Sequence, residues 1–188
     1  GTHVGMHEGA YARFRFDITD ALKAGSNEIA VRTSNAKVDS IAPLGGDFTV
    51  FGGLFRNARL VSVADAHFDM MDYGGPGLYL TPSKVTSKSA ILGAVARVSN
   101  ASKESKSLTV RLSLIDATGA VVKTFNSALK VAAGAEGTAA LNGAISRPHL
   151  WNGVTDPYVY TVRAELMSDG AVVDTIDQSL GFRDVRID

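Results

Sequence analysis

Apolar and polar residues alternate along most of the chain, with the two-residue period of half-buried β-strands. In the first third of the sequence the alternation is clear at residues 13–18, 28–33 and 58–63. It recurs later in these segments: 90–99, 108–116, 120–125, 158–167, 171–176 and 179–187. The only helical signal, one or two turns within residues 17–27, starts at Thr19 and ends near Gly25. The pattern therefore predicts an all-β protein.

Residues 73–77, Tyr-Gly-Gly-Pro-Gly, separate two strand-rich blocks, because three glycines and a proline do not fit inside a sheet. We expect a first domain at residues 1–70, a linker at 71–77 and a second domain at 78–188. Six or seven short strands at a spacing of ~8–12 residues predict an immunoglobulin-like β-sandwich in the second block. The first block has too few strands to close a sandwich, so its remaining strands are expected to precede Gly1 in a longer protein.

Composition removes several classes of function. Lys and Arg number 19, as do Asp and Glu, so the formal net charge is zero and no electrostatic case exists for nucleic acid or an anionic membrane. The absence of cysteine excludes thiol catalysis, disulfides and thiolate-bound metal. Because no apolar stretch approaches ~20 residues, no membrane-spanning segment is expected.

Three stretches carry a resemblance to a known family. Residues 1–31 hold Val-Gly, His, Gly-Ala-Tyr, Phe-Arg-Phe-Asp-Ile-Thr and Gly-Ser-Asn before a strand, and residues 47–60 hold Asp-Phe-Thr-Val-Phe-Gly-Gly-Leu-Phe-Arg-Asn. The third set is Pro-His-Leu-Trp at 148–151, Pro-Tyr-Val-Tyr at 157–160 and Gly-Phe-Arg at 181–183. The first two resemble the sugar-binding jelly-roll domain of glycoside hydrolase family 2, and the third resembles that family's immunoglobulin-like domain.

The resemblance covers nearly the whole chain, in the family's order, and within the family it is nearest to the β-galactosidases. Two positions depart from the pattern: Ala10 replaces the second glycine of Gly-Gly-Tyr, and Asn57 replaces the commoner aspartate. Neither changes the expected fold, a partial jelly-roll sandwich followed by an immunoglobulin-like β-sandwich.

The resemblance implies hydrolysis of a β-galactoside or related glycoside with retention of configuration, which needs two carboxyl groups ~5–5.5 Å apart. In this family both are glutamates on a (β/α)₈ barrel, which takes ~250 residues and alternates strands with long helices. Nothing in the sequence alternates in that way, and its five glutamates are scattered. We therefore expect an accessory region, inactive alone, that acts with a barrel of the same polypeptide. A homo-oligomer is a further expectation, and a periplasmic or secreted location is favoured over a cytoplasmic one.

Asp47 is the leading candidate for a substrate contact. The resemblance implies that it reaches from the jelly roll into the mouth of the barrel and binds a sugar hydroxyl, in some members beside a sodium ion. A carboxylate has the lone pairs for hydroxyls or a hard cation, so sodium or magnesium is a possible cofactor of the intact enzyme. The alternative is an aspartate that caps the loop before Phe48.

Other candidates in the first block are His7 and Glu8, which can face the substrate cleft. A metal site from His3, His7 and Glu8 is disfavoured, because four-residue spacing places ligands on one face only in a helix. Arg56 is expected to pair with a nearby carboxylate or with carbonyls and so to support the loop that carries Asp47.

In the second block, Trp151 can serve as a sugar-stacking platform, although burial against the sandwich core is favoured by its place between strands. Arg183 is expected to brace the interface with the barrel. Two other functions stay open. A free-standing carbohydrate-binding module needs an exposed row of aromatic residues, which are only 7% of the chain, and an adhesion-type pair of sandwiches needs a complete first domain.

Overall fold

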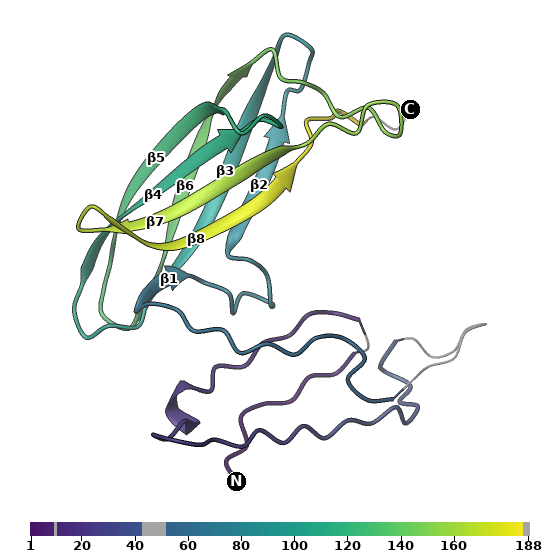
Figure 1. Cartoon of the computed structure of the whole chain (residues 1–188), viewed down its shortest axis with the longest axis vertical. Helices are drawn as coiled ribbons and strands as arrows, with labels where there is room; N and C mark the ends of the chain where they lie inside the picture. Colours follow the sequence, from purple (N-terminus) through teal and green to yellow (C-terminus); the bar gives the residue numbers. More distant parts are fainter. Residues whose placement is uncertain (10, 43–51, 186–188) are drawn as a thin grey trace. The chain divides into compact units, whose positions relative to one another are not determined.

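The structure is a computed structural model that describes residues 1–9, 11–42 and 52–185. Its contacts divide the chain into two compact units, Gly1–Ser62 and Val63–Asp188 (Figure 1). All strands assigned among the described residues lie in the second unit: β1 (Ala66–Phe68), β2 (Leu78–Ser83), β3 (Ser89–Asn100), β4 (Lys106–Ile115), β5 (Val121–Val131), β6 (Ala135–Ser146), β7 (Tyr160–Ser168) and β8 (Ala171–Leu180).

The second unit is a sandwich of two antiparallel sheets. One sheet has β3 at its centre, with β6 paired along one edge for the full length of β3. The short strands β2 and β1 follow each other along the opposite edge, where Leu78 pairs with Ala96 and Ala66 with Asn100. The other sheet has the order β5-β4-β7-β8. The sequence prediction of an all-β chain with an immunoglobulin-like sandwich is confirmed.

The core lies between the two sheets and is built from the inward-facing alternate residues. In β3 the buried positions are Ala90, Leu92, Ala94, Ala96 and Val98. They meet Val110, Leu112 and Leu114 of β4 and Val162, Ala164 and Leu166 of β7 in one cluster. Full burial of a Val or Leu side chain contributes ~1.5–3 kcal/mol, so this cluster is the main source of stability in the unit.

The alternation of apolar and polar residues does not predict β2 and β6. In β6 the residues are mostly Ala, Gly, Asn and Thr, which carry a weak strand signal. Gly143 is nevertheless required there, because a Cβ atom at this position would lie 2.1 Å from Cε1 of the Phe125 ring. The aromatic ring of β5 thus occupies the space that a side chain on β6 would fill.

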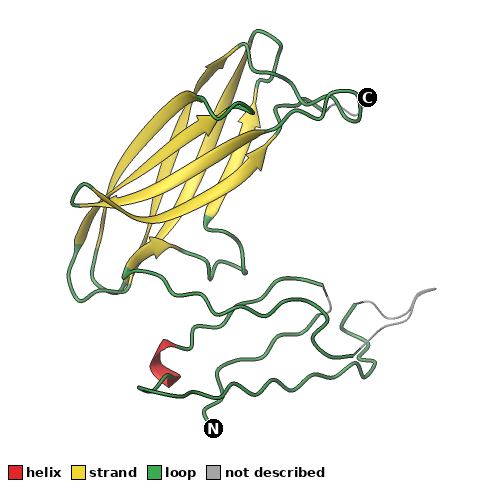
Figure 2. Ribbon diagram, in the orientation of Figure 1, coloured by secondary structure: helices red, strands yellow, loops and turns green. Residues whose placement is uncertain are grey.

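In the first unit the described residues form one regular element, the 3₁₀ turn η1 (Thr19–Ala21), at the place where the sequence predicts a helical turn. The segments 13–18, 28–33 and 58–63, predicted as strands, carry no strand assignment and are drawn as loop (Figure 2). Their alternation is real, but a strand also needs a neighbour with which to exchange backbone hydrogen bonds. Apolar residues of these segments stay exposed, including Phe14, Val31 and Leu60.

The boundary between the two units falls between residues 62 and 63, earlier in the sequence than the predicted linker at 71–77. β1 belongs to the second unit, since it pairs with β3, although the sequence assigns residues 66–68 to the first domain. Gly77 is buried against Asp69, where a Cβ atom would lie 2.5 Å from the Asp69 carbonyl oxygen. Residues 69–77 therefore pack as a loop of the sandwich.

Candidate functional site

The leading sequence candidate, Asp47, lies outside the described residues, and with it the predicted sodium or magnesium site. Among the residues that the structure does describe, no group of three or more His, Cys, Asp or Glu side chains could hold a metal ion. The same part of the chain contains no helix long and apolar enough to cross a membrane.

His7 is held by an aromatic neighbour. Its ring stacks on Phe14, with the centroids 4.3 Å apart and the planes 19° apart, and Phe14 in turn contacts Phe16. The Nε2 atom of His7 is buried and has no hydrogen-bond partner among the described residues. An unpaired buried nitrogen is costly, so this atom is suited to a polar partner beyond those residues.

Glu8 and Arg56 are both exposed. The Arg56 guanidinium lies over the ring of its neighbour Phe55, with Cζ 5.6 Å from the centroid, and that ring meets Tyr11 edge-on at 6.5 Å. Arg56 thus contacts an aromatic pair that links residues 55–56 with residue 11. The predicted pairing of Arg56 with a carboxylate or carbonyls stays a prediction.

A second site, which sequence reasoning did not assemble, lies at one end of the sandwich. The structure brings together the loop after β6 and the residues after β8, where Leu150 and Phe182 form a parallel bridge and the Trp151 N–H donates to the Phe182 carbonyl at 2.9 Å. A hollow of about 410 Å³ opens there, lined by Val85, His149, Leu150, Trp151, Asn152, Asp156, Arg183 and Asp184.

On one side of this hollow, His149 is fixed by three contacts. Its Nε2 lies 2.7 Å from Oδ2 of Asp156, and its ring stacks on Tyr158 with the centroids 3.9 Å apart and the planes 4° apart. Its backbone N–H donates to the Tyr160 hydroxyl at 2.8 Å. The imidazole is therefore held in one orientation beside a carboxylate.

On the other side, Trp151 is half-buried and its Cβ packs on Gly181. A Cβ atom added at Gly181 would lie 2.9 Å from the Trp151 Cβ. The Arg183 guanidinium lies over the indole, with Cζ 5.0 Å from the ring centroid. Such cation–π contacts are worth ~0.5–1 kcal/mol at exposed sites. Trp151 thus lines the hollow and is half-buried. The sequence had favoured burial of this side chain against the sandwich core.

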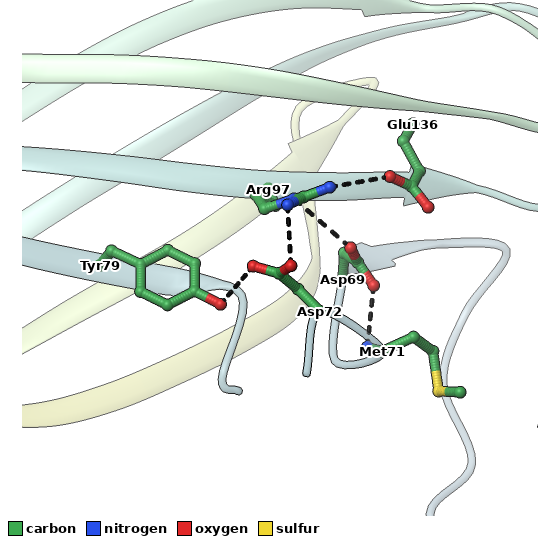
Figure 3. A network of polar contacts seen from close by, with 6 residues as sticks. All are labelled: Asp69, Met71, Asp72, Tyr79, Arg97 and Glu136. Carbon is green, nitrogen blue, oxygen red and sulfur yellow. Dashed lines mark hydrogen bonds and ion pairs between the residues drawn. The ribbon is translucent and has the colours of Figure 1, made fainter. Parts of the chain in front are cut away.

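The opposite end of the sandwich holds a polar network around Arg97 of β3 (Figure 3). Arg97 contacts Asp72 at 2.8 Å, Glu136 at 3.2 Å and the buried Asp69 at 3.6 Å. The Tyr79 hydroxyl donates to Asp72, and this hydrogen bond raises the pKa of Tyr79. The network fixes residues 69–72 on the sandwich and serves a structural role.

Three carboxyl groups of the sandwich, Asp116, Glu165 and Asp177, have a lowered pKa and are stabilised as carboxylates. Hydrogen bonds from Arg111 and Arg163 lower the pKa of Glu165 and of Asp177, respectively, and a hydrogen bond from Thr118 lowers that of Asp116. A glycosidase acid needs the opposite shift, because it must carry a proton near neutral pH. These three groups lack the electrostatic environment of an acid catalyst.

Comparisons with known proteins identify relatives of this chain. The chain is 35% identical to a beta-glucuronidase from Bacteroides fragilis over 96% of its own length and 26% of the relative's. It is 30% identical to a beta-galactosidase from Bacteroides ovatus over 100% of its length and 21% of the relative's. It thus spans about a quarter or less of the length of these relatives.

Among solved structures, beta-glucuronidase 2 from Bacteroides uniformis, covalently bound to cyclophellitol-6-carboxylate aziridine, superposes with a TM-score of 0.91 at 27% identity. The superposition covers 100% of this chain and 23% of that one. Residues 76–183, which comprise most of the sandwich, match the family described as glycosyl hydrolases family 2. The predicted resemblance is thereby confirmed, and the chain belongs to glycosyl hydrolases family 2.

Proposed function

We propose that this chain is the accessory region of a longer retaining glycoside hydrolase that cleaves O-glycosidic bonds of a β-galactoside or a β-glucuronide. The supporting observation is the match along almost all of the chain to a minor part of relatives named for these two activities. Retention requires two carboxyl groups ~5–5.5 Å apart, one of them protonated. The lowered pKa values of Glu165 and Asp177 make these two carboxyl groups unsuited to the role of the acid.

Within that enzyme, Asp47 binds a hydroxyl group of the sugar. Its support is the signature of residues 47–57 and the chemistry of a carboxylate, which accepts hydrogen bonds from several hydroxyls. His7, whose buried Nε2 lacks a partner among the described residues, is suited to donate to or accept from the same sugar. A sodium ion beside Asp47 belongs to the same proposal.

The test uses the longer enzyme, assayed with nitrophenyl β-galactoside and nitrophenyl β-glucuronide. We expect Asp47→Ala to lower kcat/KM by ~10–100-fold on the better glycoside, since a hydrogen bond to a charged group is worth ~1.5–3 kcal/mol. Asp20→Ala, an exposed aspartate in η1, is the control and should leave kcat/KM unchanged.

The two variants should melt at the same temperature, so that a kinetic loss in Asp47→Ala reports substrate binding. Equal kcat/KM values for Asp47→Ala and the wild type would contradict the proposed role of Asp47 in binding the sugar. The 188-residue chain alone should hydrolyse neither glycoside; measurable turnover by it would overturn the accessory role.

A further inference from the structure

The edge of β6 that faces away from β3 offers hydrogen bonds to another strand. We propose that this edge pairs with β6 of a second copy of this chain, antiparallel and about a two-fold axis at Leu141, so that the β3-containing sheets of the two copies form one continuous sheet. The inference goes beyond the proposed function and does not depend on it, because it concerns a surface of the sandwich and no sugar.

The hydrogen bonds between β6 and β3 determine which backbone groups face away from β3. The N–H of Arg147, directly after β6, donates to the carbonyl of Lys88, directly before β3, at 2.9 Å. In an antiparallel ladder every second pair exchanges hydrogen bonds, so the odd-numbered residues of β6 bond to β3. The N–H and C=O groups of the even-numbered residues point to the free edge: Glu136, Thr138, Ala140, Asn142, Ala144 and Ser146.

These six residues have unused backbone hydrogen-bonding groups. Among the assigned strands β6 pairs only with β3, and the N–H and C=O groups of the six residues make no other hydrogen bond within the part of the chain that the structure describes. All six residues are exposed, and no shift in register interrupts the twelve pairs between β3 and β6. A long, regular edge of this kind is a template for a further strand.

The other edge strands carry features that oppose the addition of a strand. β1 has only three residues, and β2 contains Pro82. The ladders of β5 and β8 are each interrupted by a shift in register, and β5 also holds Lys123 and Lys130. Short length, proline, lysine and bulges are devices that keep sheet edges apart. β6 has one charged residue, Glu136 near its start, so it is the edge best suited to pairing.

A second copy of this chain supplies a strand that fits. About a two-fold axis at Leu141, residue 140 lies opposite 142, residue 138 opposite 144, and residue 136 opposite 146 of the other copy. All the outward N–H and C=O groups of both strands then find partners, and the contact is self-complementary, as two-fold symmetry requires. No other register centred on β6 pairs all six residues.

The charges at the ends of β6 favour the antiparallel arrangement. It separates the two Glu136 side chains and places each opposite Ser146 of the other copy, next in sequence to the exposed Arg147. A parallel arrangement would instead bring the two glutamates together, which is destabilising across neighbouring strands.

Sedimentation velocity of the 188-residue chain measures the association. The sedimentation coefficient should rise from that of a monomer to that of a dimer between about 1 and about 200 μM, as mass action requires. Ala140→Pro should weaken the dimer ~10-fold or more, because it removes an outward N–H from each copy and leaves the hydrogen bonds to β3 intact. A monomer at every concentration, or an unaltered dimer in Ala140→Pro, would overturn the proposal.

Ala140→Lys repeats the test without a change in the backbone, since it brings two like charges near the two-fold axis. Its control is Thr124→Lys, at an exposed position of the edge strand β5. Only Ala140→Lys should weaken the dimer, and thermal unfolding followed by Trp151 fluorescence should show both variants folded. Equal weakening by the two lysines would contradict pairing through β6.

Disulfide crosslinking tests the register, because the chain has no cysteine of its own. Residues 140 and 142 of different copies should have Cα atoms ~5.5 Å apart, within disulfide range, whereas two copies of residue 140 lie diagonally, ~7–8 Å apart. A mixture of Ala140→Cys and Asn142→Cys chains should therefore form mixed disulfide dimers, identified by mass, faster than either variant crosslinks to itself. Equal rates for mixed and self-crosslinked dimers would overturn the two-fold arrangement at Leu141.

Discussion

In the first unit Phe14, Val31 and Leu60 expose 46%, 58% and 72% of their surface, whereas Leu92, Val110 and Leu112 of the second unit expose 1% or less. The two sets of residues share one sequence pattern, alternation with a period of two. In the second unit two sheets face each other, and buried apolar residues of both sheets pack in one cluster. The difference teaches that alternation specifies an extended chain with one apolar face, while burial depends on a second layer to cover that face.

Truncating one leucine in each unit measures this difference most directly. Leu112→Ala should destabilise the 188-residue chain by ~2–5 kcal/mol, because it leaves a cavity between the sheets. Leu60→Ala should change stability by less than ~0.5 kcal/mol, as for other exposed positions. Urea unfolding followed by Trp151 fluorescence reports on the sandwich, and circular dichroism reports on the whole chain. A loss from Leu60→Ala as large as that from Leu112→Ala would refute the comparison.

The same contrast explains which strands could be predicted from the sequence. β3, β4 and β7 could be predicted because apolar residues occupy every second position along them. β6 could not be predicted, since its strand character comes from pairing with β3 along twelve residues. The ladder supplies what the intrinsic propensity of Ala and Gly lacks. The division between the units is also a tertiary property, because it depends on the pairing of β1 with β3.

The hollow at the end of the sandwich likewise depends on long-range contacts. The sequence picks out Pro148–Trp151 and Gly181–Arg183 as separate family marks, yet their convergence depends on the bridge between Leu150 and Phe182. No local pattern predicts that Arg183 lies over Trp151 or that Asp156 holds His149. A signal was available, since aromatic and charged residues cluster after both β6 and β8, but the contact itself is long-range.

Two asparagines, one in each unit, allow the same comparison for hydrogen-bonded polar side chains. The Asn100 amide nitrogen is buried and donates to the carbonyls of Glu104, Val131 and Ala132, whereas Asn27 in the first unit makes three similar backbone contacts in solvent. Asn100→Ala should cost ~2–3 kcal/mol, because the Asn100 side chain is fully buried and its hydrogen bond to the Val131 carbonyl is buried with it. Asn27→Ala should cost less than ~1 kcal/mol, because water replaces the lost partner. Equal urea midpoints for the two variants would show that burial does not set the difference.

The smallest expected effect is a dependence of sandwich stability on acid pH. On the outer face of the β5-β4-β7-β8 sheet, Arg111 and Glu165 face each other across β4 and β7, with Nε and Oε2 2.8 Å apart. Arg163 and Asp177 face each other across β7 and β8, with Nη2 and Oδ2 2.7 Å apart. Hydrogen bonds from these arginines lower the pKa of both carboxyl groups from the ordinary values of 4.5 and 3.8.

A carboxyl group whose pKa is lower in the folded state binds its proton more readily when unfolded, so its contribution to stability is complete above the unfolded pKa and is lost as pH falls through the folded pKa. The urea midpoint of the sandwich should therefore decline as pH is lowered below about 4.5, and less steeply in the double variant Glu165→Gln, Asp177→Asn. Both pairs are partly solvated, which keeps the change well below that of Asn100→Ala. Glu28→Gln, in the exposed first unit, should keep the wild-type slope. An unaltered slope in the double variant would mean that the two ion pairs are no stronger in the folded sandwich than in the unfolded chain.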